Sequence, residues 1–344
     1  MNAARTEIVE EAGPAAPWLA MAHGMAQDRR VFDAQVAAFR DQFRILLIDL
    51  PGHGLSVDLP GPYGQGEMAE AMGAALDTIE APLHYWGTHT GATLGLILAA
   101  RRPERFQSLI LEGPVLPGRP FPAVAHALAR AGQIARDEGM EAARARWFEE
   151  GWFDVIRQHP EACRAEGQRS ILAEFSGKPW LAPGAAVDPI EDVLKTLQTP
   201  ILLYNGEHDV PGFIGVANEL ETLLLHVQRE RIADAGGFPA WEVPDAVNAL
   251  AAEFLNPLAL LVVGNSSSGN NRTGALNRAK LSKQYWRNDS SSKAAPGAGI
   301  TNPTGLSPES VRTPTTWQPS TAGWVCRCAS ISAGLTRNPP SRST

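Results

Sequence analysis

The sequence predicts an α/β fold, with a mostly parallel twisted sheet, helices on both of its faces and an inserted helical lid. Residues 17–114 alternate short apolar runs with amphipathic stretches, which is typical of parallel strands joined by crossover helices. Residues 115–190 interrupt this alternation with helical segments rich in Ala, Arg and Glu, and strands and helices alternate again later in the chain. Because neither flank has enough strands to close a sheet alone, one body with an insertion explains the order better than two consecutive domains.

Each expected element follows from its local pattern. A short apolar run bounded by turn residues predicts a buried strand, and apolar residues spaced three and four apart predict a helix. The stretches expected to contain strands are 17–24, 44–54, 83–88, 106–114, 199–209 and 229–233. The expected helices are 31–43, 66–80, 91–102, 213–225 and 240–255. The resulting division is a first part of the body (1–114), the lid (115–190), a second part of the body (191–256) and a tail (257–344).

The charge of the chain is unevenly distributed. The 344 residues carry a formal net charge of −7, but residues 265–344 contain 10 Lys or Arg and 2 Asp or Glu, so residues 1–264 keep 20 and 35. An acidic body repels phosphate backbones, which argues against nucleic acid as a partner. The basic tail is rich in Ser, Thr, Pro, Gly and Asn without apolar periodicity, so we expect it to be disordered.

Several other classes are disfavoured. No apolar run approaches the roughly 18 residues needed to cross a membrane, and the N-terminus has no apolar signal core, so a cytoplasmic protein that does not bind membranes is expected. The three cysteines fit neither a disulfide framework nor a zinc spacing, and the scattered histidines argue against a metal site. We therefore expect a small-molecule substrate with no cofactor and no metal, while the oligomeric state is left open.

Five landmarks stand in a fixed order along the chain. They are His23-Gly24 after a strand, "DLPGHGLS" (49–56), "GTHTG" (87–91), "GEHD" (206–209) after a late strand, and "AGGFPAWEVPDAVNALAAEFL" (235–255). Together this set resembles the α/β-hydrolase superfamily, in particular its single-domain members with a helical lid, over roughly residues 17–256. In that family G-x-S-x-G is a sharp strand-to-helix turn that exposes a nucleophile. The resemblance implies an ester or lactone hydrolase.

Two catalytic positions of the family are changed in this chain. The tip of the turn is His89 instead of serine, and Gly237 stands where the family carries its catalytic histidine. Loss of either group typically lowers turnover by about 10⁶, so a standard serine hydrolase mechanism is not expected. Asp209 matches the position of the family's acid, with Glu112 as a fallback. By resemblance, the oxyanion donors are the backbone N–H groups of Met25 and Thr90.

The paired change suggests a displaced His-Asp dyad. The far nitrogen of a histidine lies about 4.5 Å from its Cα, against roughly 2.4 Å for a serine oxygen, and this reach leads toward the space vacated at Gly237. We hypothesise that His89 acts as a general base on a water or substrate proton and that Asp209 fixes its tautomer. Two simpler interpretations remain open: His89 is an inert residue on a turn that has lost its catalytic role, and Asp209 caps a helix.

Four further residues are candidates for substrate binding. His23 borders the oxyanion loop, and Trp147, Trp152 and Trp180 belong to the lid, where they either line an apolar pocket or pack the lid on the body. The leading function is a hydrolase of a small apolar ester or lactone. The alternatives are a non-catalytic protein that binds a ligand or partner, and a cofactor-free enzyme in which His89 abstracts a proton.

Overall fold

The computed structural model describes residues 2–256, and the expected tail, residues 257–344, lies outside the described residues. Within them, seven strands form one sheet in the order β1-β3-β2-β4-β5-β6-β7. The strands are β1 (Arg5–Val9), β2 (Trp18–Ala22), β3 (Arg44–Asp49), β4 (Leu83–Thr88), β5 (Phe106–Glu112), β6 (Ile201–Gly206) and β7 (Val227–Ile232). Strand β1 runs antiparallel to β3, and all other neighbours are parallel. The mostly parallel sheet expected from the alternation is confirmed, while the edge strand β1 was not anticipated.

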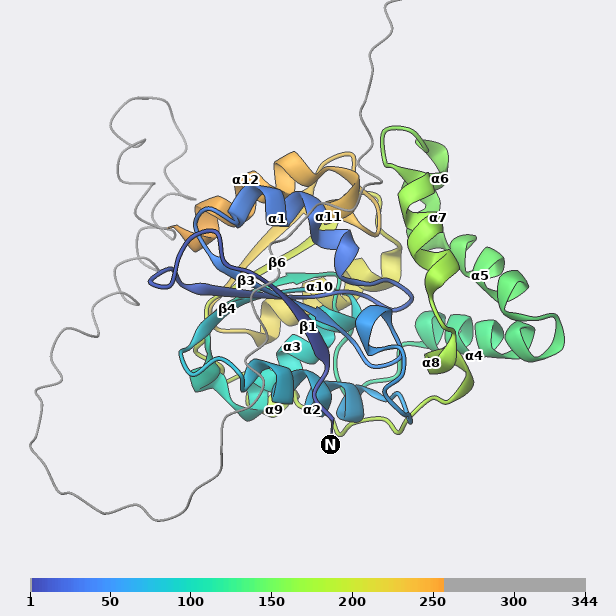
Figure 1. The fold of residues 1–344 in the computed structure, drawn as a ribbon, viewed down its shortest axis with the longest axis horizontal. Coiled ribbons are helices and arrows are strands. Elements are labelled where there is room, and N and C mark those ends of the chain that lie inside the picture. Colours follow the sequence, from blue (N-terminus) through green and yellow to red (C-terminus); the bar gives the residue numbers. More distant parts are fainter. Residues whose placement is uncertain (1, 257–344) are drawn as a thin grey trace, which may run out of the picture. The chain divides into compact units, whose positions relative to one another are not determined.

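Helices cover both faces of the sheet (Figure 1). One face carries α1 (Asp33–Phe39), α11 (Pro239–Glu242) and α12 (Pro244–Leu255). The other face carries α2 (Gln65–Leu76), α3 (Thr90–Arg101), α9 (Glu191–Leu194) and α10 (Pro211–Leu223). The short helices η1 (Arg29–Phe32), η2 (Gly54–Ser56) and η3 (Pro103–Arg105) lie in connections. This two-sided cover explains why the central strands β4 and β6 are buried at every position instead of alternating between buried and exposed residues.

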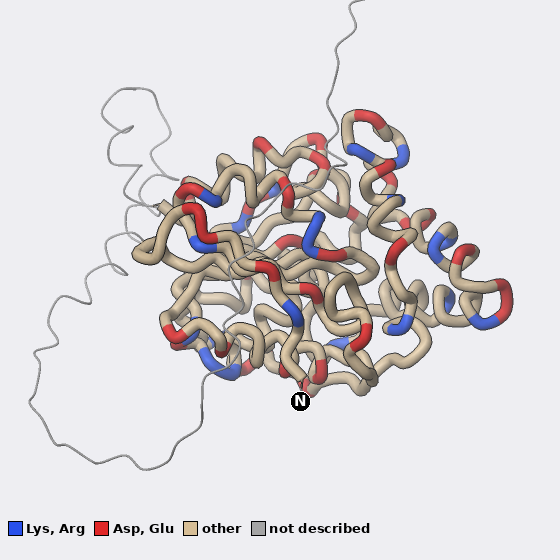
Figure 2. Tube along the Cα trace, in the orientation of Figure 1, with Lys and Arg blue, Asp and Glu red and all other residues tan. Residues whose placement is uncertain are grey.

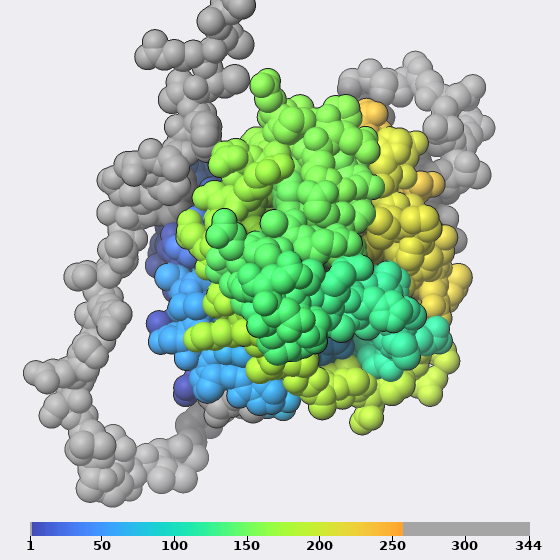
Figure 3. All heavy atoms as spheres, turned by 90° about the vertical axis from the view of Figure 1, so that its right-hand side faces the viewer, coloured from blue at the N-terminus to red at the C-terminus, as the bar shows by residue number. Residues whose placement is uncertain are grey.

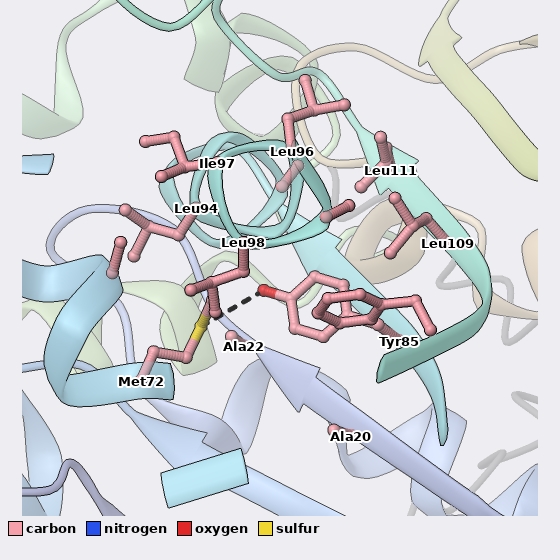
Figure 4. Packing of buried hydrophobic residues seen from close by; sticks show 14 of the residues in the cluster. Ala20, Ala22, Met72, Tyr85, Leu94, Leu96, Ile97, Leu98, Leu109 and Leu111 are labelled. Carbon is pink, nitrogen blue, oxygen red and sulfur yellow. Dashed lines mark hydrogen bonds between the residues drawn. The ribbon is translucent and has the colours of Figure 1, made fainter. Parts of the chain in front are cut away.

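The residues of β4 show how the two layers of the core are filled. Tyr85 points into the layer beneath α2 and α3, where its hydroxyl lies 3.4 Å from the sulfur of Met72 (Figure 4). Trp86 points to the opposite layer, with its ring 5.9 Å from that of Phe39. The Tyr85 hydroxyl also donates to the carbonyl of Gly91 at 2.6 Å, which ties the strand to the first turn of α3. Packing of this strand therefore holds the turn that follows it.

The last expected helix is divided in the structure. A single helix over 240–255 was predicted, but α11 ends at Glu242 and α12 begins at Pro244. Val243 between them has φ −132° and ψ 61°, outside the helical region. Proline disfavours the helical conformation in the residue before it, which accounts for the break.

The insertion predicted as a lid, residues 115–190, contains a run of helices and is called the lid below. They are α4 (Pro122–Asp137), α5 (Met140–Phe148), η4 (Gly151–Phe153), α6 (Asp154–Gln158), α7 (Ala165–Glu174) and α8 (Lys178–Leu181). Figure 3 shows these helices spread over one side of the body. Acidic and basic residues are interspersed along both the body and the lid (Figure 2). No described helix combines the length and apolar character that crossing a bilayer requires.

Candidate active site

The turn at His89 has the geometry of a nucleophile elbow. His89 joins β4 to α3 with φ 45° and ψ −104°, a conformation that costs a non-glycine residue about 1–3 kcal/mol. Both flanking positions must be glycine because neighbouring backbone leaves no room for a Cβ. A Cβ at Gly87 would lie 2.5 Å from the nitrogen of Ala92, and one at Gly91 would lie 2.0 Å from the carbonyl oxygen of Ala22. The strained tip is thus held by close packing on both sides.

Two backbone donors remain free beside this tip. The N–H groups of Met25 and Thr90 donate no hydrogen bond to any residue that the structure describes. A Cβ at Gly24 would lie 3.3 Å from the Cβ of His89, so the early loop lies directly against the elbow. Unpaired N–H groups from this loop and from the first residue of α3 are the arrangement that stabilises an oxyanion. The assignment of Met25 and Thr90 as oxyanion donors stays a prediction with this geometry in its favour.

The imidazole of His89 reaches the backbone of Gly237. Its Nε2 lies 2.6 Å from the Gly237 carbonyl oxygen, and its ring lies 5.1 Å from the ring of Phe213 and 4.8 Å from that of Phe238. Because a carbonyl oxygen only accepts, Nε2 carries the proton in the neutral ring and Nδ1 is left unprotonated. Burial lowers the pKa of His89 to about 4, while the carbonyls of Gly237 and Gly113 oppose this shift. At neutral pH the ring is therefore an uncharged base.

Asp209 makes no hydrogen bond or ion pair with His89. Its two carboxylate oxygens accept from the side-chain amide of Asn205 at 2.7 Å and from the backbone N–H of Val210 at 2.8 Å. The expected direct hydrogen bond that would fix the tautomer is therefore not present, and the Gly237 carbonyl provides that contact instead. Burial raises the pKa of Asp209 to about 6. The bond to the Val210 N–H does not cap α10 (Pro211–Leu223), because this helix has Val210 at its N-cap and no side-chain capping bond, so the helix-capping interpretation is not supported.

The lid fills the place where the family's catalytic histidine would stand. A Cβ at Gly237 would lie 2.5 Å from the carbonyl oxygen of Trp152 and 2.8 Å from its Cβ. The position is thus glycine because lid backbone lies against it. The expectation that His89 reaches toward Gly237 is confirmed, but the ring contacts the Gly237 backbone and not an empty space.

His23 is not placed to bind substrate, and we correct that assignment. Its side chain is 0% exposed. Its Nδ1 donates to the carbonyl of Gly24 at 2.7 Å, and its Nε2 accepts from the N–H of Leu50 at 3.0 Å. With both nitrogens engaged by backbone, His23 holds the loop after β2 against the loop after β3.

The three lid tryptophans form one buried cluster. The ring of Trp147 lies 5.3 Å from that of Trp152 and 5.2 Å from that of Trp180. Trp152 also lies 6.3 Å from Phe213, which contacts His89. Their packing role is therefore visible, and their contact with a substrate stays a prediction.

Two buried carboxylates lie in this region: Glu112, which the sequence offered as a fallback acid, and Glu242, which the sequence reasoning missed. Glu112 Oε2 accepts from the N–H of Ala240 at 2.8 Å, and Glu242 accepts from the backbone N–H groups of Gly236 and Phe238. Burial raises the pKa of Glu112 to about 8 and that of Glu242 to about 7. Glu242 holds the loop before α11 and Glu112 holds the first turn of α11, so Glu112 is a structural residue and not a fallback acid. No group of three or more metal-binding side chains occurs among the described residues.

The strained turn, its free backbone donors and the parallel sheet define an α/β hydrolase architecture. A family model described as alpha/beta hydrolase fold matches residues 17–244. The chain belongs to this family.

Known relatives are similar to most of the described chain. A 3-oxoadipate enol-lactonase 2 of Acinetobacter baylyi is 24% identical over 237 residues, which is 67% of this chain and 86% of that protein. A pimeloyl-[acyl-carrier protein] methyl ester esterase of Methylococcus capsulatus is 26% identical over 260 residues, 70% of this chain and 94% of that protein. Among solved structures, MenH from S. aureus has a TM-score of 0.65 at 21% identity and covers 73% of this chain and 98% of its own. The enol-lactonase from Burkholderia xenovorans has a TM-score of 0.63 at 25% identity, covering 73% and 96%.

Proposed function

We propose that the protein hydrolyses small, fairly apolar esters or lactones, with His89 as general base on a water molecule. The observation that carries this proposal is the elbow itself. A strained His89 lies beside two unpaired N–H groups, those of Met25 and Thr90, although the family's serine and histidine are both replaced. Strain retained at one turn is typical of functional sites. The relatives named as an enol-lactonase, a carboxylesterase and a methyl ester esterase indicate the substrate class.

The proposed reaction has two steps. The carbonyl oxygen of the ester accepts from the N–H groups of Met25 and Thr90, while water attacks the carbonyl carbon and gives a proton to Nδ1 of His89. The tetrahedral oxyanion then collapses, the bond to the leaving oxygen breaks, and the imidazolium returns the proton to that oxygen. The contact between Nε2–H and the Gly237 carbonyl keeps Nδ1 available as the base.

Asp209 enters the proposal as a stabiliser of the charged imidazole. Its partner Asn205 lies near the same glycine as His89: a Cβ at Gly113 would lie 3.2 Å from His89 Nδ1 and 3.6 Å from Asn205 Nδ2. Asn205 Oδ1 is buried and has no hydrogen-bond partner among the described residues. We propose that His89 and Asp209 interact through Asn205, and not through a direct hydrogen bond.

A non-catalytic ligand-binding protein is the second candidate. It is favoured by the hydrogen bond that holds the His89 ring on Gly237 and by the two phenylalanines that enclose it. In this case the free N–H pair would bind an anion or a carbonyl oxygen without turnover.

Hydrolysis of a panel of short-chain esters and lactones distinguishes the two candidates. We expect turnover by the wild type, a decrease of at least tenfold in His89→Ala, and a smaller decrease in Asp209→Asn. The matched control is His126→Ala, which removes an exposed histidine from α4. Thermal stabilisation by a ligand without turnover would favour the binding protein. Unchanged activity in both site variants would remove the dyad.

A further inference from the structure

The oxyanion loop is fixed by hydrogen bonds at every backbone N–H around Met25. The N–H of Gly24 donates to the side-chain oxygen of Gln27 at 3.2 Å, and the N–H of Ala26 donates to Nε2 of His53 at 3.2 Å. The N–H of Gln27 donates to the carbonyl of Gly24 at 3.4 Å. Only the N–H of Met25 in this run is left for a ligand, so the surrounding contacts determine where it points.

The side chain of Gln27 connects this loop to the lid. Its oxygen Oε1 accepts from Gly24, while its nitrogen Nε2 donates to Oε1 of Gln168 in α7 at 3.3 Å. Gln27 and Gln168 are 3% and 2% exposed, so water does not replace these bonds. One group, the Gly24 N–H, sets the donor-to-acceptor direction of this series of hydrogen bonds. Because Oε1 of Gln27 accepts from the Gly24 N–H, the NH₂ group of Gln27 faces the lid. Gln168 therefore presents its oxygen as the acceptor.

We propose that Gln27 and Gln168 form an amide relay that positions the Met25 N–H, so that the oxyanion pair is complete only while α7 is seated on the loop. Both are positioning residues, because neither is required to touch the substrate. The inference rests on the proposed function in naming the N–H pair as the site of the developing oxyanion. The control of the loop by one lid side chain does not itself depend on turnover.

The loop has little stability of its own if the relay is broken. Ala26 holds φ 61°, a left-handed conformation that is unfavourable for a residue with a Cβ. Without the acceptor on Gln27, the buried N–H of Gly24 loses its partner, at a cost of about 1–3 kcal/mol unless the loop moves. Movement of the loop shifts Met25, and a displacement of about 1 Å at a catalytic donor lowers the rate by up to 10²-fold.

Five variants test the relay: four single substitutions and the double variant Gln27→Met/Gln168→Met. Gln27→Met and Gln168→Met keep volume and remove the amides, while Gln168→Glu keeps an oxygen acceptor for Gln27. Gln133→Met makes the same change at an exposed lid position on α4 and is the matched control. Three quantities are measured: kcat and KM for an ester, the affinity for the phenyl methylphosphonate monoanion as a non-covalent tetrahedral oxyanion, and hydrogen exchange at residues 24–27.

The relay predicts a defined pattern. Gln27→Met lowers kcat and phosphonate affinity by about tenfold or more with KM nearly unchanged, and Gln168→Met does so by roughly three- to tenfold. Gln168→Glu restores most of the loss. In the double variant, Gln168→Met adds less than about twofold to Gln27→Met, because the lid residue acts through the loop residue. Exchange at residues 24–27 accelerates in both Met variants and not in the control.

The outcomes separate the relay from the proposed function. If the wild type hydrolyses esters and Gln168→Met equals the control in all three measurements, or if the two Met effects are additive, the relay is overturned while the function stands. If no ester is hydrolysed but phosphonate binding and exchange follow the predicted pattern, the relay stands and the proposed hydrolase does not.

Discussion

Replacing Gly237 by alanine should destabilise the protein although it adds a single methyl group. The new Cβ would lie 2.5 Å from the carbonyl oxygen of Trp152, whereas ordinary contact begins at 3.4 Å. Gly237 does not have a positive φ, so the conformation itself permits alanine and the effect comes from the contact alone. A backbone oxygen cannot rotate away, so the lid turn at η4 must shift by nearly 1 Å. Overpacking of this kind costs about 1–3 kcal/mol.

The assay is urea or thermal unfolding of the variant beside a matched control. The cost corresponds to a decrease in Tm of roughly 2–12 °C for a domain of this size. Gly215→Ala is the control, because a Cβ there meets nothing within 4 Å in the helix α10, and it should stabilise the protein by about 0.5–1 kcal/mol. Equal or greater stability of Gly237→Ala would refute the claim that the lid occupies this position. Gly237→His, which restores the family's histidine, meets the same obstacle.

Three other predictions concern the buried acids, the nucleophile and the lid. Burial raises the pKa of Glu112 from 4.5 to about 8, so the native state binds its proton more tightly and the wild type loses stability as pH rises from about 4.5 to 8. Glu112→Gln lacks this slope and should gain roughly 2–4 kcal/mol relative to wild type between pH 5 and pH 9 in urea unfolding; parallel curves would contradict it. A serine-directed phosphonate probe should leave the protein unlabelled by mass spectrometry, because His89 stands at the elbow; labelling would show that the nucleophile lies elsewhere. Trp152→Ala removes a ring that packs on Trp147 and Phe213 and should cost about 3–5 kcal/mol in unfolding free energy, and a loss below about 1 kcal/mol would show that the lid packs differently.

The sequence predicts the scaffold well because its signals are local. Alternating apolar runs define the strands, and the two glycines around His89 are required by contacts with neighbouring backbone. The strand β1 was missed because it is a short edge strand of five residues, of which only Val9 is buried, and such a strand carries a weak pattern. The break before Pro244 was a local signal that could have been used.

The partners of the site residues were not predictable in the same way. Asp209 bonds to Asn205 four residues earlier, a short-range signal, but His89 bonds to a carbonyl 148 residues away. Gln168 meets Gln27 across 141 residues, and nothing in the local sequence of α7 marks it. Such contacts depend on where the inserted lid packs on the body. The periodicity of apolar residues does not encode this position. The burial of His23 likewise follows from the packing of two loops, each after a different strand.

The role of His89 as the base is tested most directly by comparing two titrations. We would measure kcat/KM for an ester from pH 3.5 to 8 and follow the His89 ring by NMR over the same range, with His89→Ala to assign its signals. Burial lowers the pKa of this imidazole to about 4, well below the 6 to 7 typical of an exposed dyad. The account predicts a rate that is constant above about pH 7, decreases modestly as Asp209 is protonated near pH 6, and falls further with the protonation of the ring near pH 4. A rate that stays constant while the ring titrates, or that survives in His89→Ala, would contradict it.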